Sequence, residues 1–459
     1  MIQNSITMDG FVSAIVLAVF ALIFYEIYLR TRPSYRAAAQ FPGSKVFPIV
    51  QNIFTVLFMS QTRAFANARK LANAYNNQSY RTLVAGILIV EATHHKDVEM
   101  LLSSSRLITK SPFYRLTYPF IGIGLLNSTG EKWHQRRKIL TPTFHFNILE
   151  GFLQIFHEEC RRLVVQLEED AAQGCTTVLQ KLFSTVTLNT ICETAMGIKL
   201  DKSEKSEVYK SNIQDVGKII QLQMMNPLLH VGWIFRMIGY KSKFDKILQP
   251  IHAFTKSIIQ HRRDAFHAFG SDVDSLSEEN VHMNVKQRYA MLDSLLLAEA
   301  QQRIDAKGIR EEVDTFTFEG HDTTASALVF LFLVIANENT VQERLYEEIQ
   351  CMFKSRPNPT MQSYSDLKYM DRVIKESLRI YPPVPFISRL VTEDVQCNGK
   401  VIPKGSFMNV HIYDLHRDPE QFSDPERFDP DRFLPESVQR RNPYAYVPFS
   451  AGLRNCIGE

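Results

Sequence analysis

The stretch that decides the fold reads Phe449-Ser450-Ala451-Gly452-Leu453-Arg454-Asn455-Cys456-Ile457-Gly458 and lies near the C-terminus of the 459-residue chain. An isolated cysteine in an intracellular protein is most often a small buried apolar residue. The flanking glycines favour a different interpretation of Cys456, because Gly452 permits a tight turn and Gly458 permits the close approach of a flat cofactor. The sequence therefore predicts that Cys456 binds a cofactor through its sulfur.

The other side chains of this loop suit a haem. Arg454 supplies a cation for a haem propionate, and Phe449 can shield the sulfur of Cys456. Backbone amides that point at a thiolate moderate its charge, and an apolar wall around it sets the reduction potential of the iron. Because a strongly donating thiolate favours cleavage of the O–O bond, the loop predicts activation of oxygen.

Composition places the chain among ordinary globular proteins. Apolar residues make up 45% and charged residues 22%, and 52 basic against 49 acidic residues give a net charge of +3, so nothing indicates nucleic-acid binding. The cysteines are widely spaced and form no Cys-x-x-Cys pair, which favours a reducing compartment. They are Cys160, Cys175, Cys192, Cys351, Cys397 and Cys456.

The N-terminus is more apolar than the rest. Phe11 to Tyr25 contains no charged residue, and the apolar character continues to Leu29 with only Glu26 interrupting it. A cleaved signal peptide is the alternative, but the basic residues follow the apolar run instead of preceding it. These basic residues are Arg30, Arg32 and Arg36. We therefore expect a retained membrane helix.

This interpretation divides the chain into three parts. Residues 1–30 are expected to form a membrane anchor, residues 31–50 a proline-containing connector, and residues 51–459 a haem-binding catalytic domain. The positive-inside rule places the catalytic domain on the cytosolic face of the membrane.

The patterns of the large domain predict a mainly α fold with a smaller β region. Helical periodicity dominates as far as about residue 380, apart from a strand pair around Tyr80 to Val90. After Pro382 short strands follow, with a hairpin turn at Asn398-Gly399 and a further strand over Phe407 to Ile412. The polar stretches Asp201 to Ser206 and Gly270 to Gln287 are expected to be exposed loops.

One long helix is expected over Arg310 to Asn337, and its middle reads Glu319-Gly320-His321-Asp322-Thr323-Thr324. Glycine, aspartate, histidine and threonine are poor or mediocre helix formers, so their place in a buried helix indicates a site. The structural alternative is that Thr323 donates to the carbonyl of Glu319 and bends the helix.

Here a resemblance becomes specific. The pattern F-x-x-G-x-R-x-C-x-G around Cys456 resembles the haem-binding signature of the cytochromes P450, and residues 319–324 resemble the family's A/G-G-x-D-T-T segment. The resemblance extends over nearly the whole chain and implies the cytochrome P450 fold with haem b as cofactor. It also implies that Asp322 and Thr323 deliver protons to dioxygen. Leu453 departs from the family, where proline is usual.

The segment Glu312 to Thr324 looks like the signature of family 4 of the cytochromes P450, a branch that includes microsomal lipid omega-hydroxylases. Glu319 stands where most families have a small residue, and the matching glutamate of family 4 commonly forms an ester to a haem methyl. The alternative is an ordinary solvated glutamate.

Further motifs resemble the scaffold of the family. Glu376 and Arg379 match its E-x-x-R helix, in which a later arginine completes a buried network, although alone they are an ordinary helical pair. Arg427 and Arg432 are the candidates for the later arginine, and we choose Arg432 for its distance from Cys456.

Three residues are candidate partners of the haem propionates. Trp133 and Arg137 resemble the family's W-x-x-x-R pair, although a solvated basic face is an alternative for them. Arg389 is the third candidate.

The resemblance implies a monooxygenase of the endoplasmic reticulum membrane that hydroxylates a fatty acid or another extended lipid. NADPH-cytochrome P450 reductase is the expected electron donor, with cytochrome b5 as a second possible partner, and membrane lipid surrounds the anchor. Candidate pocket segments are Ser111 to Leu126 and Met224 to Ile238, and the second also dips into the membrane in one interpretation.

Two other functions remain open. One is a haem-thiolate isomerase or dehydratase that needs no reductase, against which the intact Asp322-Thr323 pair argues. The other is a haem or lipid binder without turnover. The chain stops at Glu459, three residues past Cys456, where the family continues into a helix beneath the haem. We therefore expect this apparently truncated chain to retain haem poorly and to turn over little.

Overall fold

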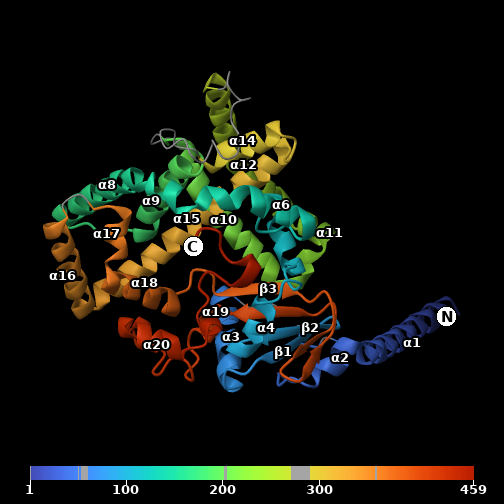
Figure 1. The fold of residues 1–459 in the computed structure, drawn as a ribbon. Coiled ribbons are helices and arrows are strands. Elements are labelled where there is room, and N and C mark those ends of the chain that lie inside the picture. Colours follow the sequence, from blue (N-terminus) through green and yellow to red (C-terminus); the bar gives the residue numbers. More distant parts are fainter. Residues whose placement is uncertain (1, 50, 53–59, 201–203, 270–289, 357–358) are drawn as a thin grey trace.

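The computed structural model describes residues 2–49, 51–52, 60–200, 204–269, 290–356 and 359–459. Most of them are helical, and the strands gather on one side of the body (Figure 1). The prediction of a mainly α fold with a smaller β region is confirmed. The predicted loop at Gly270 to Gln287 and residues 201–203 lie outside the described residues, whereas residues 204–206 begin a helix, so the predicted loop was wrong there.

The helical side surrounds one long helix, α15, which begins at Ala306 and ends at Asn337. It begins four residues earlier than predicted, where the side chain of Asp305 accepts a hydrogen bond from the Gly308 amide at 2.7 Å and so caps the first turn. The largest apolar core packs against the first half of α15. The helices that contact α15 are α5 (Tyr118–Ile121), α9 (Leu179–Thr194), α12 (Tyr240–Phe269), α14 (Met291–Ala300), α16 (Asn339–Ser355) and α18 (Lys368–Ile380). Outside them, α6 (Gly130–Leu140) packs on α14, α8 (Leu153–Ala172) on α9, and α10 (Glu204–Met225) on α12.

The remaining helices of the body are α2 (Pro33–Ala38), α3 (Gln61–Ala74), α4 (His95–Leu102), α7 (Phe146–Glu150), α11 (Gly232–Met237), α17 (Met361–Ser365), α19 (Ile412–Leu415) and α20 (Pro435–Arg440).

The strands form a four-stranded sheet in the order β1-β2-β6-β3 and a separate two-stranded hairpin, β4-β5. The strands are β1 (Tyr80–Val84), β2 (Ile87–Ala92), β3 (Phe386–Leu390), β4 (Val395–Cys397), β5 (Lys400–Ile402) and β6 (Phe407–His411). Only the β2-β6 pair is parallel. Asn398 and Gly399 both have positive φ, at 49° and 75°, as the predicted two-residue hairpin turn requires.

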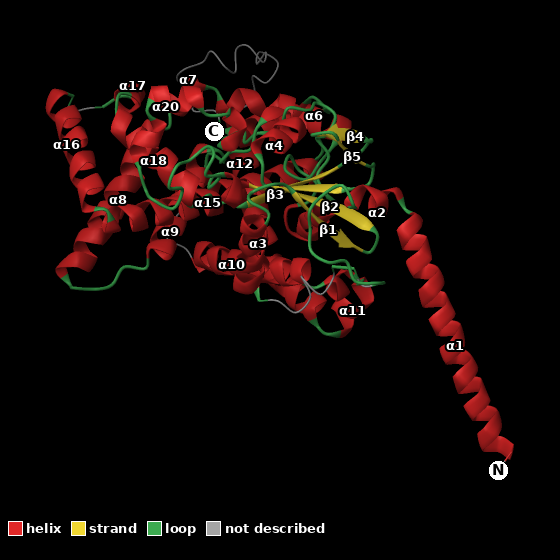
Figure 2. Cartoon of the chain, turned by 90° about the horizontal axis from the view of Figure 1, so that it is seen from below, coloured by secondary structure: helices red, strands yellow, loops and turns green. Residues whose placement is uncertain are grey.

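The N-terminal helix α1 (Ile2–Thr31) projects away from the body (Figures 1 and 2). Its segment Gly10–Thr31 is long and apolar enough to cross a membrane. Leu29, near the end of the helix, is buried against the body, while Phe11 is 67% exposed. Ala306–Asn337 is also long and apolar enough to cross a membrane, but this segment is the core helix α15. The apolar surface of α1 is what a membrane anchor requires.

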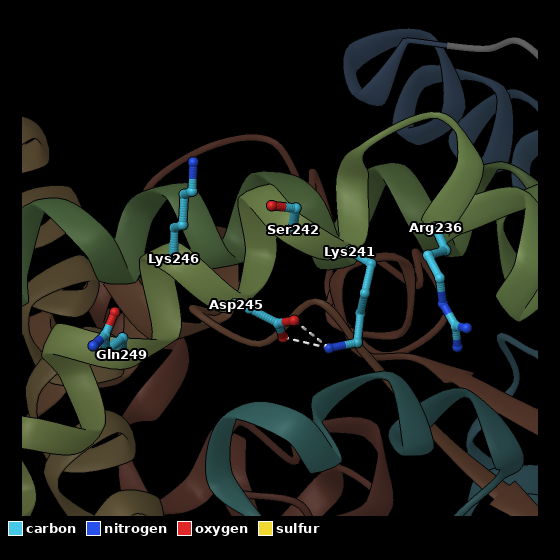
Figure 3. Close-up of a pocket in the computed structure, with 6 residues that line it drawn as sticks. All are labelled: Arg236, Lys241, Ser242, Asp245, Lys246 and Gln249. Atoms are coloured by element: carbon cyan, nitrogen blue, oxygen red, sulfur yellow. Dashed lines mark hydrogen bonds and ion pairs between the residues drawn. The ribbon is translucent and has the colours of Figure 1, made fainter.

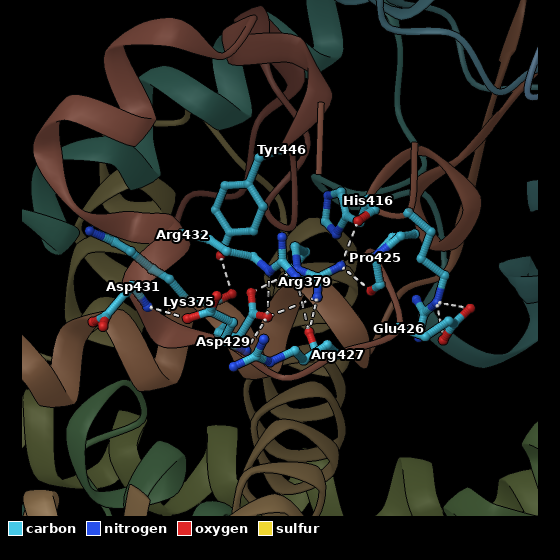
Figure 4. A network of polar contacts seen from close by, with 12 residues as sticks. Lys375, Arg379, His416, Pro425, Glu426, Arg427, Asp429, Asp431, Arg432 and Tyr446 are labelled. Carbon is cyan, nitrogen blue, oxygen red and sulfur yellow. Dashed lines mark hydrogen bonds and ion pairs between the residues drawn. The ribbon is translucent and has the colours of Figure 1, made fainter. Parts of the chain in front are cut away.

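A buried ion pair connects α18 to the coil that leads to the cysteine loop (Figure 4). Glu376 and Arg379 are fully buried, and their side chains form two hydrogen bonds of 2.7 and 2.8 Å. Arg432 Nε lies 3.4 Å from Glu376 Oε1, whereas Arg427 contributes only its carbonyl oxygen, 3.1 Å from Arg379 Nη2. The choice of Arg432 over Arg427 is therefore confirmed.

Replacing Arg379 by leucine is expected to lower the free energy of unfolding by about 3–5 kcal/mol, because Glu376 keeps its buried charge and loses its bidentate partner. Lys375→Leu on the same helix is the matched control, since Lys375 pairs with Asp371 on the exposed surface and such pairs contribute roughly 0–1 kcal/mol. Urea unfolding of both variants measures the difference. Equal losses of stability would contradict the assigned role of the buried pair.

Candidate functional site

Backbone geometry shapes the cysteine loop. Gly452 has φ of 68°, and a β-carbon at this position would overlap the carbonyl oxygen of Leu102 in α4, so only glycine fits. The Cys456 amide donates to the carbonyl of Phe449 at 2.9 Å and closes the loop. Position 452 therefore requires glycine, as predicted, because the backbone of the cysteine loop lies close to the backbone of α4.

The Cys456 side chain is exposed, but enough protein surrounds it for desolvation to raise the pKa of its thiol. A hydrogen bond from the Gly458 amide acts in the opposite direction and lowers this pKa. An amide aimed at the sulfur is the arrangement that moderates the charge of a thiolate ligand. Phe449 is 36% exposed.

Two arginines attach the loop to α6 and the segment before it. Arg454 donates to the carbonyl oxygens of Ser128 and Leu126 at 2.9 and 2.8 Å, and its guanidinium lies 4.8 Å from the centre of the Trp133 ring. Arg137 donates to the Asn455 carbonyl at 3.1 Å and to the Asn455 side chain at 2.9 Å. Trp133 and Arg137 both contact the cysteine loop. The alternative that they belong to a solvated basic face is therefore wrong.

Three cations gather beside Glu319 of α15. Desolvation and the charge of Arg389 lower the pKa of Lys110, and desolvation and Arg389 also lower that of Arg454, to about 9. Arg389 is 1% exposed, and desolvation lowers its pKa too. The Lys110 ammonium lies 4.6 Å from the centre of the Tyr114 ring, and residues 110 and 389 form a β-bridge.

This cluster fits a haem. The three cations repel one another, and within the described part of the chain Glu319 is the carboxylate whose charge acts on both Lys110 and Arg454. A buried excess of positive charge is costly without an anionic partner. The two propionates of a haem would supply that partner, next to a cysteine with an accessible sulfur.

Glu319 is partly buried. Desolvation raises the pKa of its carboxyl to about 7, although the charges of Lys110 and Arg454 lower it. These surroundings disfavour an ordinary solvated glutamate, and the role of Glu319 at a cofactor stays a prediction. Because Glu319 points to the side of α15 on which the cations gather, it lies on the same side as the proposed haem.

Thr323 and Asp322 of the α15 motif differ in their surroundings. The Thr323 hydroxyl donates to the Glu319 carbonyl at 2.6 Å, which is the structural alternative stated from the sequence. Desolvation raises the pKa of Asp322, so this carboxyl exchanges its proton closer to neutral pH than a solvated one. The two residues are adjacent, and their functional roles remain predictions.

Sequence reasoning missed Lys110, and it included Tyr114 only as one residue of the candidate pocket segment Ser111 to Leu126. Both lie more than 300 residues before Cys456, and nothing in their local pattern marks them as neighbours of the cysteine loop. Only the pairing of residue 110 with Arg389 at the edge of the sheet brings them to the cluster.

A haem-thiolate protein is the class that this fold and this site define. The family description "Cytochrome P450" matches residues 41–459, and the chain belongs to that family. Its members are monooxygenases that hold a haem iron through a cysteine thiolate. The recognition from the cysteine loop and the α15 motif is confirmed.

Similar curated proteins carry names in family 4. Probable cytochrome P450 4ac1 of Drosophila melanogaster is 41% identical over 409 residues, which cover 89% of this chain and 79% of that protein. Cytochrome P450 4d2 of the same organism is 38% identical over 463 residues, covering 98% and 90%. Cytochrome P450 4c21 of Blattella germanica is 35% identical over 456 residues, covering 98% and 89%.

Lys110→Met is expected to accelerate haem loss by about tenfold to a hundredfold, because one charge-assisted hydrogen bond contributes roughly 1.5–3 kcal/mol. Transfer of haem to an apo-globin, followed by absorbance, measures the rate. Arg106→Met is the matched control, since Arg106 lies four residues earlier and forms an exposed pair with Glu393. If both variants lose haem at the rate of the unmodified chain, Lys110 does not contact the cofactor.

Proposed function

We propose that this chain is a membrane-bound monooxygenase that hydroxylates fatty acids or similar extended lipids with electrons from NADPH-cytochrome P450 reductase. The observation that carries the proposal is the meeting of the cysteine loop, the cation cluster and the α15 motif around Glu319. One oxygen atom of O2 enters the substrate and the other leaves as water, at the expense of two electrons and two protons.

In this proposal Cys456 would hold the haem iron through its sulfur, and Lys110, Arg389 and Arg454 would neutralise the propionates. Arg137 holds the cysteine loop through Asn455, and Trp133 supports the guanidinium of Arg454. When bound, the haem supplies the oxygen-activating chemistry that a thiolate ligand favours. Phe449 limits access of water to the sulfur.

Asp322 and Thr323 move protons to the oxygen site. The Thr323 hydroxyl donates to the Glu319 carbonyl, so its oxygen is still able to accept a hydrogen bond from water. Desolvation raises the pKa of Asp322, so its carboxyl holds a proton more readily than a solvated one and is able to pass it on. An isomerase or dehydratase would not need this pair.

Apolar rings in the predicted pocket segment support a lipid substrate. Phe318 of α15 and Phe120 of α5 meet edge to face with ring centres 4.9 Å apart. Phe113, in the 3-10 helix Pro112–Thr117, packs 5.6 Å from Phe407. Both Phe113 and Phe120 belong to the pocket segment Ser111 to Leu126 predicted from the sequence, and neither ring offers a polar group to a substrate.

A basic pocket beside the cysteine loop suits an acidic electron donor such as the reductase or cytochrome b5. It has a volume of about 410 Å³, and Arg137, Lys138 and His134 line it together with Gly452 and Asn455. Basic residues around a docking site attract a partner of opposite charge and speed its association.

The membrane proposal rests on two surfaces. The anchor segment 1–30 forms most of α1, and Trp233 and Met237 of α11 are 65% and 71% exposed. Beside α11, a pocket of about 690 Å³ is lined by the basic residues Arg236, Lys241 and Lys246 (Figure 3). Apolar side chains next to basic ones are the combination that binds an anionic lipid surface. We propose the cytosolic face of the endoplasmic reticulum as the location.

The matching glutamate of family 4 supports a covalent ester between Glu319 and a haem methyl, and the raised pKa of Glu319 keeps part of this carboxyl protonated at neutral pH. Acidic organic solvent is expected to leave the haem attached to an active preparation of the chain and to extract it fully from Glu319→Ala. Absorbance of the protein fraction after extraction measures the bound haem. Complete extraction from the unmodified chain would exclude the ester.

Reconstitution of the full chain with haem, reductase and lipid tests the proposed activity. With NADPH, isotopically labelled O2 and a long-chain fatty acid, we expect a hydroxylated product that carries one labelled oxygen atom. Cys456→Ser is the control, because an alcohol is a poor ligand and the thiolate-type spectrum of the reduced carbonyl complex should disappear.

The same assay separates the other functions. Conversion of the lipid without reductase and without O2 would indicate an isomerase or dehydratase. Binding of lipid and haem with no conversion would indicate a binder without turnover.

A further inference from the structure

His321 is the residue of the α15 motif to which neither the sequence nor the proposed function assigns a task. It directly precedes Asp322, and its side chain is only 2% exposed. The Thr187 hydroxyl of α9 donates to its carbonyl oxygen at 3.0 Å, and its ring meets that of Tyr209 of α10 with centres 6.2 Å apart. His321 therefore faces α9 and α10, away from the cation cluster at Glu319.

The ring of His321 is buried without a hydrogen-bond partner. Neither Nδ1 nor Nε2 has one within the described part of the chain. A buried polar atom without a partner costs about 1–3 kcal/mol, and native proteins almost always pair such atoms with protein or with ordered water. A phenylalanine would fill this core position without that cost.

The ring is also in its neutral form. Burial, and then the positive charge of Lys210, lower the pKa of His321 to about 4. A neutral imidazole has one donor and one acceptor nitrogen, so it takes a proton on one side while it releases one on the other.

A polar connection to the surface begins at Lys210 of α10. Its ammonium donates to the Thr185 hydroxyl at 2.7 Å and to Glu207 at 2.6 Å. Lys210 is nearly buried, whereas the Glu207 side chain is 57% exposed and exchanges protons with bulk water. The Lys210 charge acts on His321, so the two groups are electrostatic neighbours.

Tyr209 and Asp322 lie at the inner end of this polar connection. Tyr209 is 1% exposed, and burial raises the pKa of its phenol. The charges of Cys192, Asp314 and Asp322 raise this pKa further, which places the phenol within electrostatic range of Asp322. The ring contact between His321 and Tyr209, together with the charges of Lys210 and Asp322 that act on these two rings, places polar groups on both sides of His321.

We propose that His321, together with Tyr209, holds ordered water between α10 and α15 and acts as a positioning residue that supplies protons to Asp322 from the Glu207–Lys210 pair. The inference rests on the proposed monooxygenase function. The path carries only protons, two for each O2 reduced, while the electrons arrive from the reductase. For each proton that leaves one ring nitrogen of His321, one arrives at the other.

Two variants of the full reconstituted chain test the path. His321→Phe keeps the ring volume and removes both nitrogens, whereas His321→Gln keeps a donor and an acceptor. We expect His321→Phe to reduce product formed per NADPH several-fold and to increase the solvent deuterium isotope effect on turnover, and His321→Gln to restore most of both. His157→Phe is the matched control, because His157 is partly buried and paired with the Tyr364 hydroxyl.

Two further measurements separate this inference from the proposed function. The reduced carbonyl spectrum of His321→Phe should equal that of the unmodified chain, and a crystal structure should show water within about 3.2 Å of both ring nitrogens. Unchanged coupling and isotope effect in His321→Phe would overturn the path, as would a dry ring. If the unmodified chain forms no product at all, the proposed function fails, and the water at His321 alone decides this inference.

Discussion

The rest of the structure depends on the burial of the polar first half of α15. Glu311, Glu312 and Asp314 are at most 3% exposed, and buried carboxyl groups require partners. Glu311 pairs with Lys132 of α6 at 2.7 Å, and Glu312 accepts from the Leu125 amide at 2.9 Å. Asp314 accepts from the hydroxyl of a threonine in α12 at 2.6 Å. These hydrogen bonds and ion pairs hold α6, α12 and the segment after α5 against α15.

The charge balance changes along the same helix. In its first turns each buried carboxyl group has a cation as partner: Lys132 pairs with Glu311, Arg136 with Glu312, and Arg310 with Asp314. Desolvation still raises the pKa of Glu312 and Asp314 to about 7. At Glu319 three cations face one carboxyl, and desolvation lowers the pKa of Arg454 to about 9. This local excess of positive charge distinguishes the proposed cofactor site from the first turns of α15. Buried charges without a partner are costly, so an excess of cations is expected only where an anionic ligand binds.

The sequence was sufficient wherever function requires a local pattern. The cysteine loop, the α15 motif, the E-x-x-R pair and the Asn398-Gly399 turn each fit within about 15 residues, and each was predicted. What escaped prediction depends on contacts between distant segments. Lys110 joins the cluster only through the sheet, and Arg137 reaches Asn455 across 318 residues. The sequence also left open whether Glu319 is solvated, since burial depends on the packing of the whole helix.

Gly320 shows how one motif serves both packing and chemistry. A β-carbon here would come within 2.6 Å of the Ile191 side chain, so glycine lets α9 lie close against α15. That approach brings the Thr187 hydroxyl to the carbonyl of His321 and occupies it with a side-chain donor. On the opposite side of the helix the Glu319 carbonyl accepts from Thr323. A threonine that donates to the backbone is still able to accept from water, so its bond to Glu319 fixes the hydroxyl in place and leaves its oxygen available for proton transfer.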